Sequence, residues 1–517
     1  MRTDTTEKGL ESIIVRSMTG RTDLISSTPY TVIETAAPVV GGSGWLLGDS
    51  RHYDRGACVD LVQLRGFIRA TQPTLVDALM LEDDAPARRQ FLARLEKEVA
   101  RRGVIDVLRK GVEHGPHHLD LFYGTPSPGN EKASERFACN RFSVTRQFMY
   151  SRDETRRALD LGLFINGLPI ATFELKNSLT KQTVADAVQQ YMRDRDPREP
   201  LFAFGRCVVH LAVDDSEVKF CTELKGKASW FLPFNQGFHD GAGNPPNPNG
   251  MKTAYLWERV LTPSGLTDIL ENYAQVIEET DRRTAKKTRK QVFPRYHQLD
   301  VVRKLLASAR EIGAGRRYLI QHSAGSGKSN SIAWLAHQLI AVRKDGVKAF
   351  DSIIVVTDRR ILDEQIQENI KQFAQVGALV GAVTGRGGSK TQELSKFLEA
   401  GKKIIISTVQ TFPYLLREIG DAHRGKRFAI IIDEAHSSQG GKTASAMSEA
   451  LAVPLDLRVT RPTPPKAPFP RGLGGGWGRL KIHHFSRGHS VALRTCPLAG
   501  AGFHPLPASP AGGGVFL

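Results

Sequence analysis

A glycine-rich turn between an apolar run and a helical run constrains the fold of this chain more than any other feature. The turn reads HSAGSGKS at 322–329, after RYLIQ and before NSIAWLAHQLIAV. Its two glycines let backbone N–H groups turn toward phosphate oxygens, its lysine reaches β and γ phosphates, and its last serine can bind Mg²⁺. The start of the helix adds the positive end of its dipole. The residues expected to hold the phosphates are Gly325, Ser326, Gly327, Lys328 and Ser329.

A second apolar run, AIIIDEAH, ends in two neighbouring carboxylates, the first of them 105 residues after Lys328. We expect Asp433 to hold Mg²⁺ through water and Glu434 to polarise the water that attacks the nucleotide. We also expect Lys328 and Asp433 to lie at the C-terminal ends of adjacent parallel strands. The usual turn pattern has a glycine where His322 stands. The turn and the acidic pair together predict a site for ATP and Mg²⁺.

Short apolar runs alternate with helical runs across residues 290–455. The runs are RYLIQ, SIIVVT, KIIIST and FAIIID. Continuous apolar runs separated by helices are typical of a parallel sheet that is covered on both faces. This pattern predicts an α/β domain.

Two acids and a lysine interrupt the apolar stretch LDLGLFINGLPIATFELK, residues 159–176. NGLP is a turn signal, so we expect Asp160 and Glu174 on neighbouring strands of a hairpin. Glu174 and Lys176 are two residues apart and therefore share one face of a strand. Two carboxylates there can hold Mg²⁺, and Lys176 can orient a water or stabilise the phosphate being cut. A surface ion pair on an edge strand is the alternative interpretation.

The second half of the chain resembles the first RecA-like motor lobe of superfamily 2 DNA helicases and translocases. FPRYHQ, with Gln298, lies where that group has the glutamine that reads adenine, and VVTDRRILDEQ and STVQTF lie where it first contacts the DNA backbone. The resemblance implies phosphate contacts by polar residues at strand ends. They are Thr357, Arg359, Thr408 and Gln410. Ordinary polar loop residues are the alternative.

Longer strings resemble the R (restriction) subunit of type I restriction–modification systems. They are TEKGLESIIVRSMTG, YDRGACVDLVQLRGFIRATQP, NRFSVTRQF, NGLPIATFELKNS, QHSAGSGKSNSIAWLAHQL and DEAHSSQGGKT. The resemblance implies a PD-(D/E)xK nuclease domain in residues 1–280, with Asp160 and Glu174 as Mg²⁺ ligands and Lys176 as a catalytic residue. It also implies ATP-dependent cutting and translocation of double-stranded DNA, with methylation (M) and specificity (S) subunits as partners. A separate subunit would carry the DNA recognition sequence.

One departure from that family lies in the segment TVADAVQQYM. The family often has a glutamine four residues before a tyrosine, whereas here Ala187 stands four residues before Tyr191, with Gln189 and Gln190 between them. Apolar residues recur at helical spacing in the same segment, so Tyr191 as a core residue is the alternative.

The composition changes again in the C-terminal tail, residues 456–517. The tail has no carboxylate after Asp456 and is rich in proline and glycine. This predicts irregular or disordered sequence, of the kind that a frameshift in a GC-rich gene produces. The family continues with a second motor lobe, so we expect a truncated chain that binds ATP without appreciable turnover. Two other functions stay open: a non-catalytic remnant that binds DNA or ATP, and a stand-alone helicase–nuclease.

The formal net charge of +17 indicates a polyanionic partner, with nucleic acid ahead of a membrane surface. The five cysteines show no CxxC spacing, which indicates a reduced cytoplasmic chain, and the N-terminus has no apolar signal core. No run approaches the roughly 18 apolar residues of a membrane span.

Overall fold

The structure is a computed structural model in which the described residues form two compact units. The described residues are 7–21, 42–153, 157–177, 180–239, 241–280, 284, 287–323, 325–357, 380–383, 390–408, 426–433 and 489–497. Unit 1 comprises Met1–Phe238 and Ala242–Tyr296, and unit 2 comprises His239–Gly241 and His297–Leu517.

The division between the units falls after a basic segment, DRRTAKKTRK at 281–290. This segment runs into β13 (Lys287–Val292), which pairs with β12 (Gln275–Thr280) in an antiparallel ribbon. The side-chain amide of Gln291 donates to the carbonyl oxygens of Cys207 and Val208, at 2.7 and 2.9 Å. These buried hydrogen bonds hold the ribbon in unit 1.

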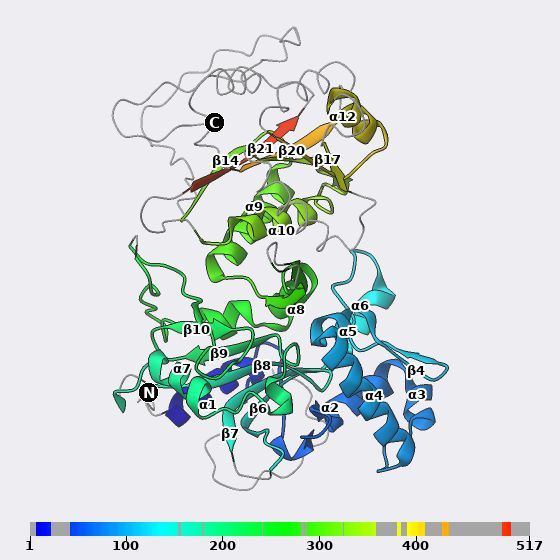
Figure 1. Ribbon diagram of the computed structural model, residues 1–517, viewed down its shortest axis with the longest axis vertical. Coiled ribbons are helices and arrows are strands. Elements are labelled where there is room, and N and C mark those ends of the chain that lie inside the picture. Colours follow the sequence, from blue (N-terminus) through cyan, green and yellow to red (C-terminus); the bar gives the residue numbers. More distant parts are fainter. Residues whose placement is uncertain are drawn as a thin grey trace, which may run out of the picture. The chain divides into compact units, whose positions relative to one another are not determined.

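Unit 1 contains a seven-stranded mixed sheet with the order β1-β6-β7-β8-β9-β10-β11 (Figure 1). β1–β6 and β8–β9 are parallel pairs, and the other neighbours are antiparallel. The strands are β1 (Leu46–Leu47), β6 (Phe142–Met149), β7 (Ala158–Ile165), β8 (Leu168–Leu175), β9 (Val209–Val213), β10 (Val218–Cys221) and β11 (Leu232–Pro233). Together with its helices, this sheet gives unit 1 a mixed α/β architecture.

The hairpin of β7 and β8 forms at the predicted turn. Asn166 and Gly167 both have positive φ, 50° and 83°, and Ile165 pairs directly with Leu168. A two-residue turn with this backbone matches the right-handed twist of its strands. Every residue of β8 is buried, so the acidic end of this strand lies in the interior.

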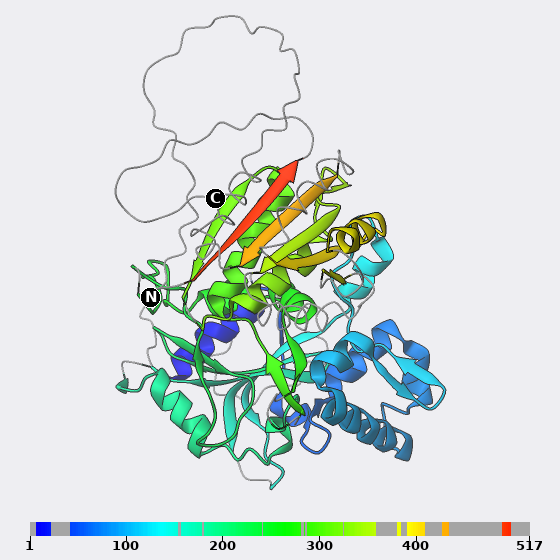
Figure 2. The same ribbon diagram turned by 45° about the horizontal axis from the view of Figure 1, so that its top comes forward.

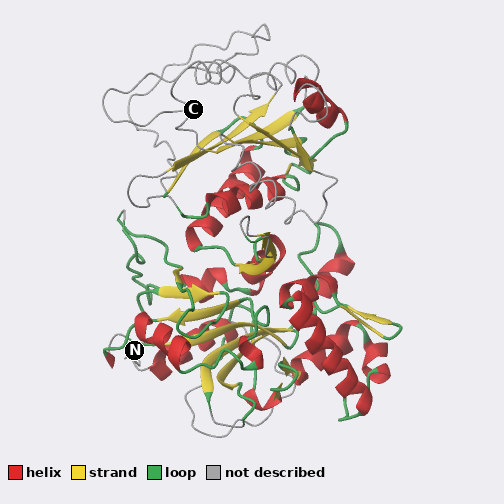
Figure 3. Cartoon of the chain, in the orientation of Figure 1, coloured by secondary structure: helices red, strands yellow, loops and turns green. Residues whose placement is uncertain are grey.

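Helices of unit 1 surround the sheet and build a separate helical group around α2–α5 (Figure 3). The helical stretch at 86–110 divides at Gly103, whose φ of 84° ends one helix and starts the next. The helices are α1 (Glu7–Thr19), α2 (Leu61–Thr71), α3 (Pro73–Ala78), α4 (Pro86–Arg102), α5 (Val104–Lys110), α6 (Glu131–Ala138), α7 (Val184–Arg193) and α8 (Pro263–Asn272). Two small ribbons complete the unit, β2 (Tyr53–Asp54) with β3 (Val59–Asp60) and β4 (Val112–His114) with β5 (His117–Leu119).

Unit 2 contains a six-stranded sheet with the order β14-β21-β20-β17-β19-β18. β20, β17, β19 and β18 are parallel neighbours, as predicted. The strands are β14 (Arg317–His322), β17 (Ser352–Thr357), β18 (Val380–Ala382), β19 (Ile404–Thr408), β20 (Arg427–Asp433) and β21 (His489–Pro497). A short ribbon joins β15 (Arg343–Lys344) to β16 (Val347–Lys348). The helices are α9 (Tyr296–Ile312), α10 (Lys328–Leu339) and α12 (Lys390–Glu399), and α9 and α10 lie on the same face of the sheet (Figure 3).

β21 contradicts two predictions, because it lies between β14 and β20 and is antiparallel to both (Figure 2). The sheet is therefore not wholly parallel, and β14 and β20 are not adjacent. The tail is also not wholly irregular, although its other residues lie outside the described part of the chain. Val491, Leu493 and Thr495 alternate along β21 and favour a strand. The proline and glycine content of the tail concealed this short signal.

None of the helices that the structure describes combines the length and the apolar character needed to cross a bilayer.

Candidate functional site

The two carboxylates and the lysine of the ELK segment meet at one end of the β7–β8 hairpin. Leu161 pairs with Phe173, so Asp160 and Glu174 come next to each other in the antiparallel register. The backbone N–H of Leu175 donates to a carboxylate oxygen of Asp160 at 2.6 Å. Lys176 follows β8 directly, and its own N–H donates to the carbonyl oxygen of Val213 on β9 at 2.9 Å. The predicted grouping of Asp160, Glu174 and Lys176 thus occurs in the folded chain.

The members of this group differ in how deeply their side chains are buried. The Glu174 side chain is fully buried and Lys176 is 9% exposed, whereas Asp160 is half-buried. The surface ion pair considered as an alternative is therefore excluded for Glu174. A buried carboxylate needs a cationic or hydrogen-bonding partner, because the interior solvates a negative charge poorly.

Arg195 supplies that partner, and sequence reasoning missed it. Its Nε donates to Oε1 of Glu174 at 2.6 Å, and the Arg195 side chain is only 7% exposed. Oε2 of Glu174 is buried without a hydrogen-bond partner in the described part of the chain. Arg195 stands two residues beyond α7 among several arginines, so nothing local distinguishes it from its neighbours.

The pKa of Glu174 is raised from 4.5 to about 8, and burial is the main cause. The nearby charge of Asp160 raises this pKa further, while Arg195 and Lys176 lower it. The unpaired Oε2 and the neighbouring Asp160 carboxylate are oxygen ligands of the kind that Mg²⁺ prefers. The described residues contain no group of three or more His, Cys, Asp or Glu side chains placed so that they could hold a metal ion. Any cation here would therefore rely on two carboxylates, backbone oxygens and water.

Tyr191 packs in the core, as the apolar stripe of its helix predicts. Its side chain is fully buried, and its hydroxyl lies 2.8 Å from Oγ1 of Thr172 on β8. Thr172 also lies 2.8 Å from Nδ1 of His210 on β9. This network supports the strand that carries Glu174. Gln189 is exposed and Gln190 half-buried.

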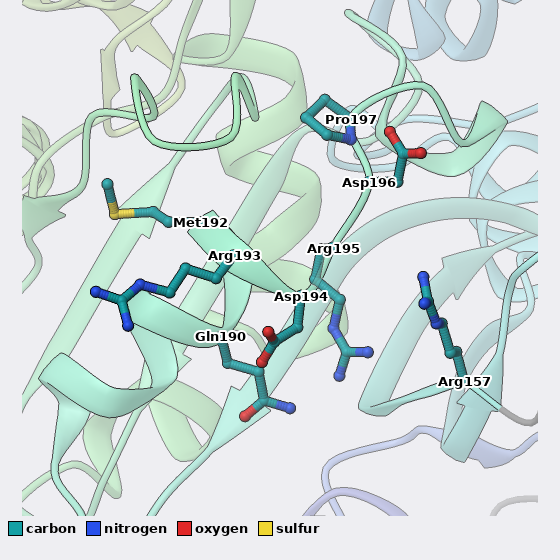
Figure 4. A pocket seen from close by; sticks show the side chains of 8 residues that line it. All are labelled: Arg157, Gln190, Met192, Arg193, Asp194, Arg195, Asp196 and Pro197. Carbon is teal, nitrogen blue, oxygen red and sulfur yellow. The ribbon is translucent and has the colours of Figure 1, made fainter.

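A polar pocket opens beside this group, at the C-terminal end of α7 (Figure 4). Its volume is about 570 Å³. The residues that line it are Arg157, Gln190, Met192, Arg193, Asp194, Arg195, Asp196 and Pro197. Arg195 links the pocket to Glu174, because the same guanidinium lines one and bonds the other.

The predicted phosphate loop joins β14 to α10 in unit 2. Gly325 and Gly327 have positive φ, 73° and 82°, and Lys328 begins the helix. The side-chain amide of Gln298 donates to the carbonyl oxygen of Gly327 at 2.8 Å. Gln298 thus contacts the loop itself, while Ser326 is buried and Ser329 half-buried.

Asp433 ends β20 at the edge of the sheet where β14 also ends. Both Ile320 and Asp433 pair with Val491 of the intervening β21, and β14 and β20 run parallel to each other. The two strands are thus separated by one strand, at roughly 4.8 Å per step. The prediction that β14 and β20 end at the same edge of the sheet is correct, and the prediction that these two strands are adjacent is wrong. Thr357 and Thr408 end β17 and β19; Arg359, Gln410 and Glu434 lie outside the described residues.

Two family models match the chain. Residues 84–229 match the type I restriction enzyme R protein N terminus, and residues 297–460 match the SWI2/SNF2 ATPase family. The first match includes Asp160, Glu174 and Lys176, and the second includes the phosphate loop and Asp433. The mixed α/β unit 2, with its parallel strands, agrees with a helicase-like lobe.

Curated proteins that are similar to this chain are named as endonuclease subunits of type I restriction enzymes. The type I restriction enzyme HindI endonuclease subunit of Haemophilus influenzae is 26% identical over 324 residues, which are 60% of this chain and 29% of that protein. The type I restriction enzyme SauMSSORF170P endonuclease subunit of Staphylococcus aureus is 26% identical over 310 residues, 58% of this chain and 30% of that protein. The chain thus spans about three tenths of the length of these relatives. Over the matched residues the chain is similar to the endonuclease subunits of type I restriction enzymes, with residues 84–229 matching the R protein N terminus and residues 297–460 matching the SWI2/SNF2 ATPase.

Proposed function

We propose that unit 1 is a PD-(D/E)xK nuclease that cuts DNA with Mg²⁺ and that unit 2 is the first RecA-like lobe of an ATP-driven DNA motor. The observation that carries the proposal is the convergence of Asp160, Glu174 and Lys176 at one strand end. A buried, unpaired Oε2 of Glu174 lies in that group. The relatives' names and the two matched families support the same assignment.

In the proposed nuclease, Asp160 and Glu174 hold Mg²⁺, which would supply an activated water and neutralise charge on the phosphate being cut. Glu174 would bind the cation from a fully buried position, and Asp160, opposite it on β7, from a half-buried one. Lys176 shares a face with Glu174 and carries a positive charge toward the group. Its role is to orient the attacking water or to stabilise the extra negative charge on the phosphate.

In the proposed motor lobe, the loop N–H groups and Lys328 bind the phosphates of ATP. Ser329 and Asp433 hold the accompanying Mg²⁺, and Glu434 polarises the attacking water. Gly325 and Gly327 already have the backbone conformation that such a loop needs. Gln298 is the proposed adenine-reading residue, and its hydrogen bond to the carbonyl oxygen of Gly327 supports this assignment.

Double-stranded DNA is the proposed substrate, and the formal net charge of +17 suits a polyanion. Methylation and specificity subunits of a type I restriction complex are the proposed partners, in the cytoplasm. Co-purification with both subunits tests this part, since a stand-alone helicase–nuclease would not retain them.

The test of the nuclease is nicking of supercoiled plasmid in Mg²⁺ by the wild-type chain and by Asp160→Asn. We expect the variant to lose nicking while its circular dichroism spectrum stays unchanged. Glu223→Gln is the matched control. Glu223 is not a member of the group and forms an ion pair with Lys225 at 2.7 Å. Equal nicking by Asp160→Asn and the wild type would exclude this site.

A further inference from the structure

Arg195 is tied to three strands of the unit 1 sheet at the end where the carboxylates meet. Its Nε donates to Oε1 of Glu174 on β8 at 2.6 Å, and its Nη2 donates to the carbonyl oxygen of Ala158 on β7 at 2.8 Å. Its Nη1 lies 3.5 Å from the hydroxyl of Tyr150, just after β6, and the guanidinium stands 5.7 Å from the centre of that ring. The side chain therefore has one fixed position.

This contact differs from the usual pairing of arginine with a carboxylate. Arginine often binds both carboxylate oxygens with two parallel N–H groups. Here Nη2 of Arg195 donates to the carbonyl oxygen of Ala158 and not to the carboxylate. Arg195 therefore binds only Oε1 of Glu174. Oε2 is buried and has no hydrogen-bond partner among the described residues. One oxygen of the carboxylate is held in place while the other is left available.

From this geometry we infer that Arg195 is a positioning residue for the cation site, an inference that rests on the proposed nuclease function. It fixes the rotation of the Glu174 carboxylate through Oε1 and leaves Oε2 available to a cation that Asp160 would share. Ligating carboxylates are themselves commonly hydrogen-bonded, and loss of such a partner costs roughly 10- to 100-fold in metal affinity. Arg195 also ties Ala158, two residues before Asp160, to Glu174. It thereby sets the spacing of the two ligands.

The experiment measures binding of Mn²⁺ by electron paramagnetic resonance, with plasmid nicking over a range of Mg²⁺ concentrations as the second readout. Arg195→Met removes the hydrogen bonds and keeps much of the apolar stem, and Arg195→Lys keeps the charge and can reach one partner. Arg198→Met is the control, because Arg198 lies on the same loop, pairs with Asp196 and has a 90% exposed side chain.

We expect Arg195→Met to weaken Mn²⁺ binding at least about tenfold and to raise the Mg²⁺ concentration for half-maximal nicking by a similar factor. The rate at saturating Mg²⁺ should stay within a few fold of the wild type, because Arg195 contacts no reacting atom. Arg195→Lys should recover part of the affinity, and Arg198→Met should match the wild type.

Unchanged or tighter Mn²⁺ binding by folded Arg195→Met would overturn the inference. If Arg195→Met fails to fold, Arg195→Lys serves as the test instead. Wild-type Mn²⁺ affinity in that variant would show that the guanidinium, which bonds both Glu174 and Ala158, is not required for cation binding. Asp160→Asn separates the two proposals. If that variant binds Mn²⁺ as the wild type does, the nuclease site itself is wrong, whereas loss in Asp160→Asn with none in the Arg195 variants refutes only the role of Arg195.

Discussion

The hydroxyl of Tyr191 on α7 lies 2.8 Å from Oγ1 of Thr172, two residues before Glu174 on the same face of β8. Helix α7 therefore supports the acidic strand from within the core. Tyr191→Phe keeps the ring and removes this one hydrogen bond. We expect the free energy of unfolding of unit 1 to fall by about 1 kcal/mol. Mg²⁺-dependent nicking should change less than about threefold, because Thr172 keeps its contact with His210.

Tyr191→Ala provides the comparison, since it also removes the buried ring and should cost roughly 3–5 kcal/mol. Hydrogen exchange of peptides from β8 and α7 measures both effects. A complete loss of nicking in a stably folded Tyr191→Phe would instead give the hydroxyl a direct role in the reaction.

His210 makes the stability of unit 1 depend on pH. Burial lowers its pKa from 6.5 to about 3, so the folded chain holds it neutral while the unfolded chain protonates it. The contribution of neutral His210 to the free energy of unfolding is fully present above pH 6.5 and is lost as the pH falls toward 3. Between pH 7.5 and pH 5 the loss amounts to about 2 kcal/mol.

His210→Asn tests this contribution, because the asparagine side chain can still bond Thr172 and does not titrate. Its stability deficit relative to the wild type should shrink by about 2 kcal/mol on acidification to pH 5. Urea unfolding followed by hydrogen exchange of β9 reports the difference. A deficit that is constant over this pH range would contradict the assignment.

Lys176→Met should separate the chemistry from cation binding. The lysine is not one of the two proposed ligands, so Mn²⁺ should still bind within a few fold of the wild-type affinity. The nicking rate should fall by on the order of 10²–10³, the usual effect of losing one group that stabilises transition-state charge. Wild-type nicking by a folded Lys176→Met would remove Lys176 from the catalytic set.

Gly327→Ala should weaken ATP binding. Gly327 has φ of +82°, and an added Cβ would lie 2.5 Å from the side-chain nitrogen of Gln298. The left-handed conformation alone costs a non-glycine residue on the order of 1–2 kcal/mol, so the affinity for a fluorescent ATP analogue should fall about tenfold or more. Gly346→Ala is the matched control, because Gly346 has φ of +78° and an added Cβ there would meet nothing within 4 Å.

Local signals in the sequence predicted the parts of the site that local chain geometry sets. Asn166 and Gly167 form the predicted turn, and the two-residue spacing puts Glu174 and Lys176 on one face. Tyr191 follows the helical period of its apolar neighbours into the core. In each case a few neighbouring residues determine the conformation.

Contacts between distant segments escaped prediction. Arg195 reaches Glu174 across 21 residues, and no feature of its own neighbourhood indicates that contact. The burial that raises the pKa of Glu174 depends on strands and helices packed from both sides. β21 enters its sheet far from its neighbours in sequence, so the adjacency of β14 and β20 could not be judged from their own residues.

The tight turn at Asn166 and Gly167 also has a consequence for the order of folding. Hairpins close in roughly 1–10 μs, whereas contacts between distant segments form later because longer loops must close first. Asp160 and Glu174 are therefore brought together early, before the chain that carries Arg195 has docked. In that interval the two carboxylates repel each other without the compensating charge of Arg195. Millimolar Mg²⁺ present during refolding should therefore speed the appearance of native unit 1, and Asp160→Asn should fold at a rate that does not depend on Mg²⁺.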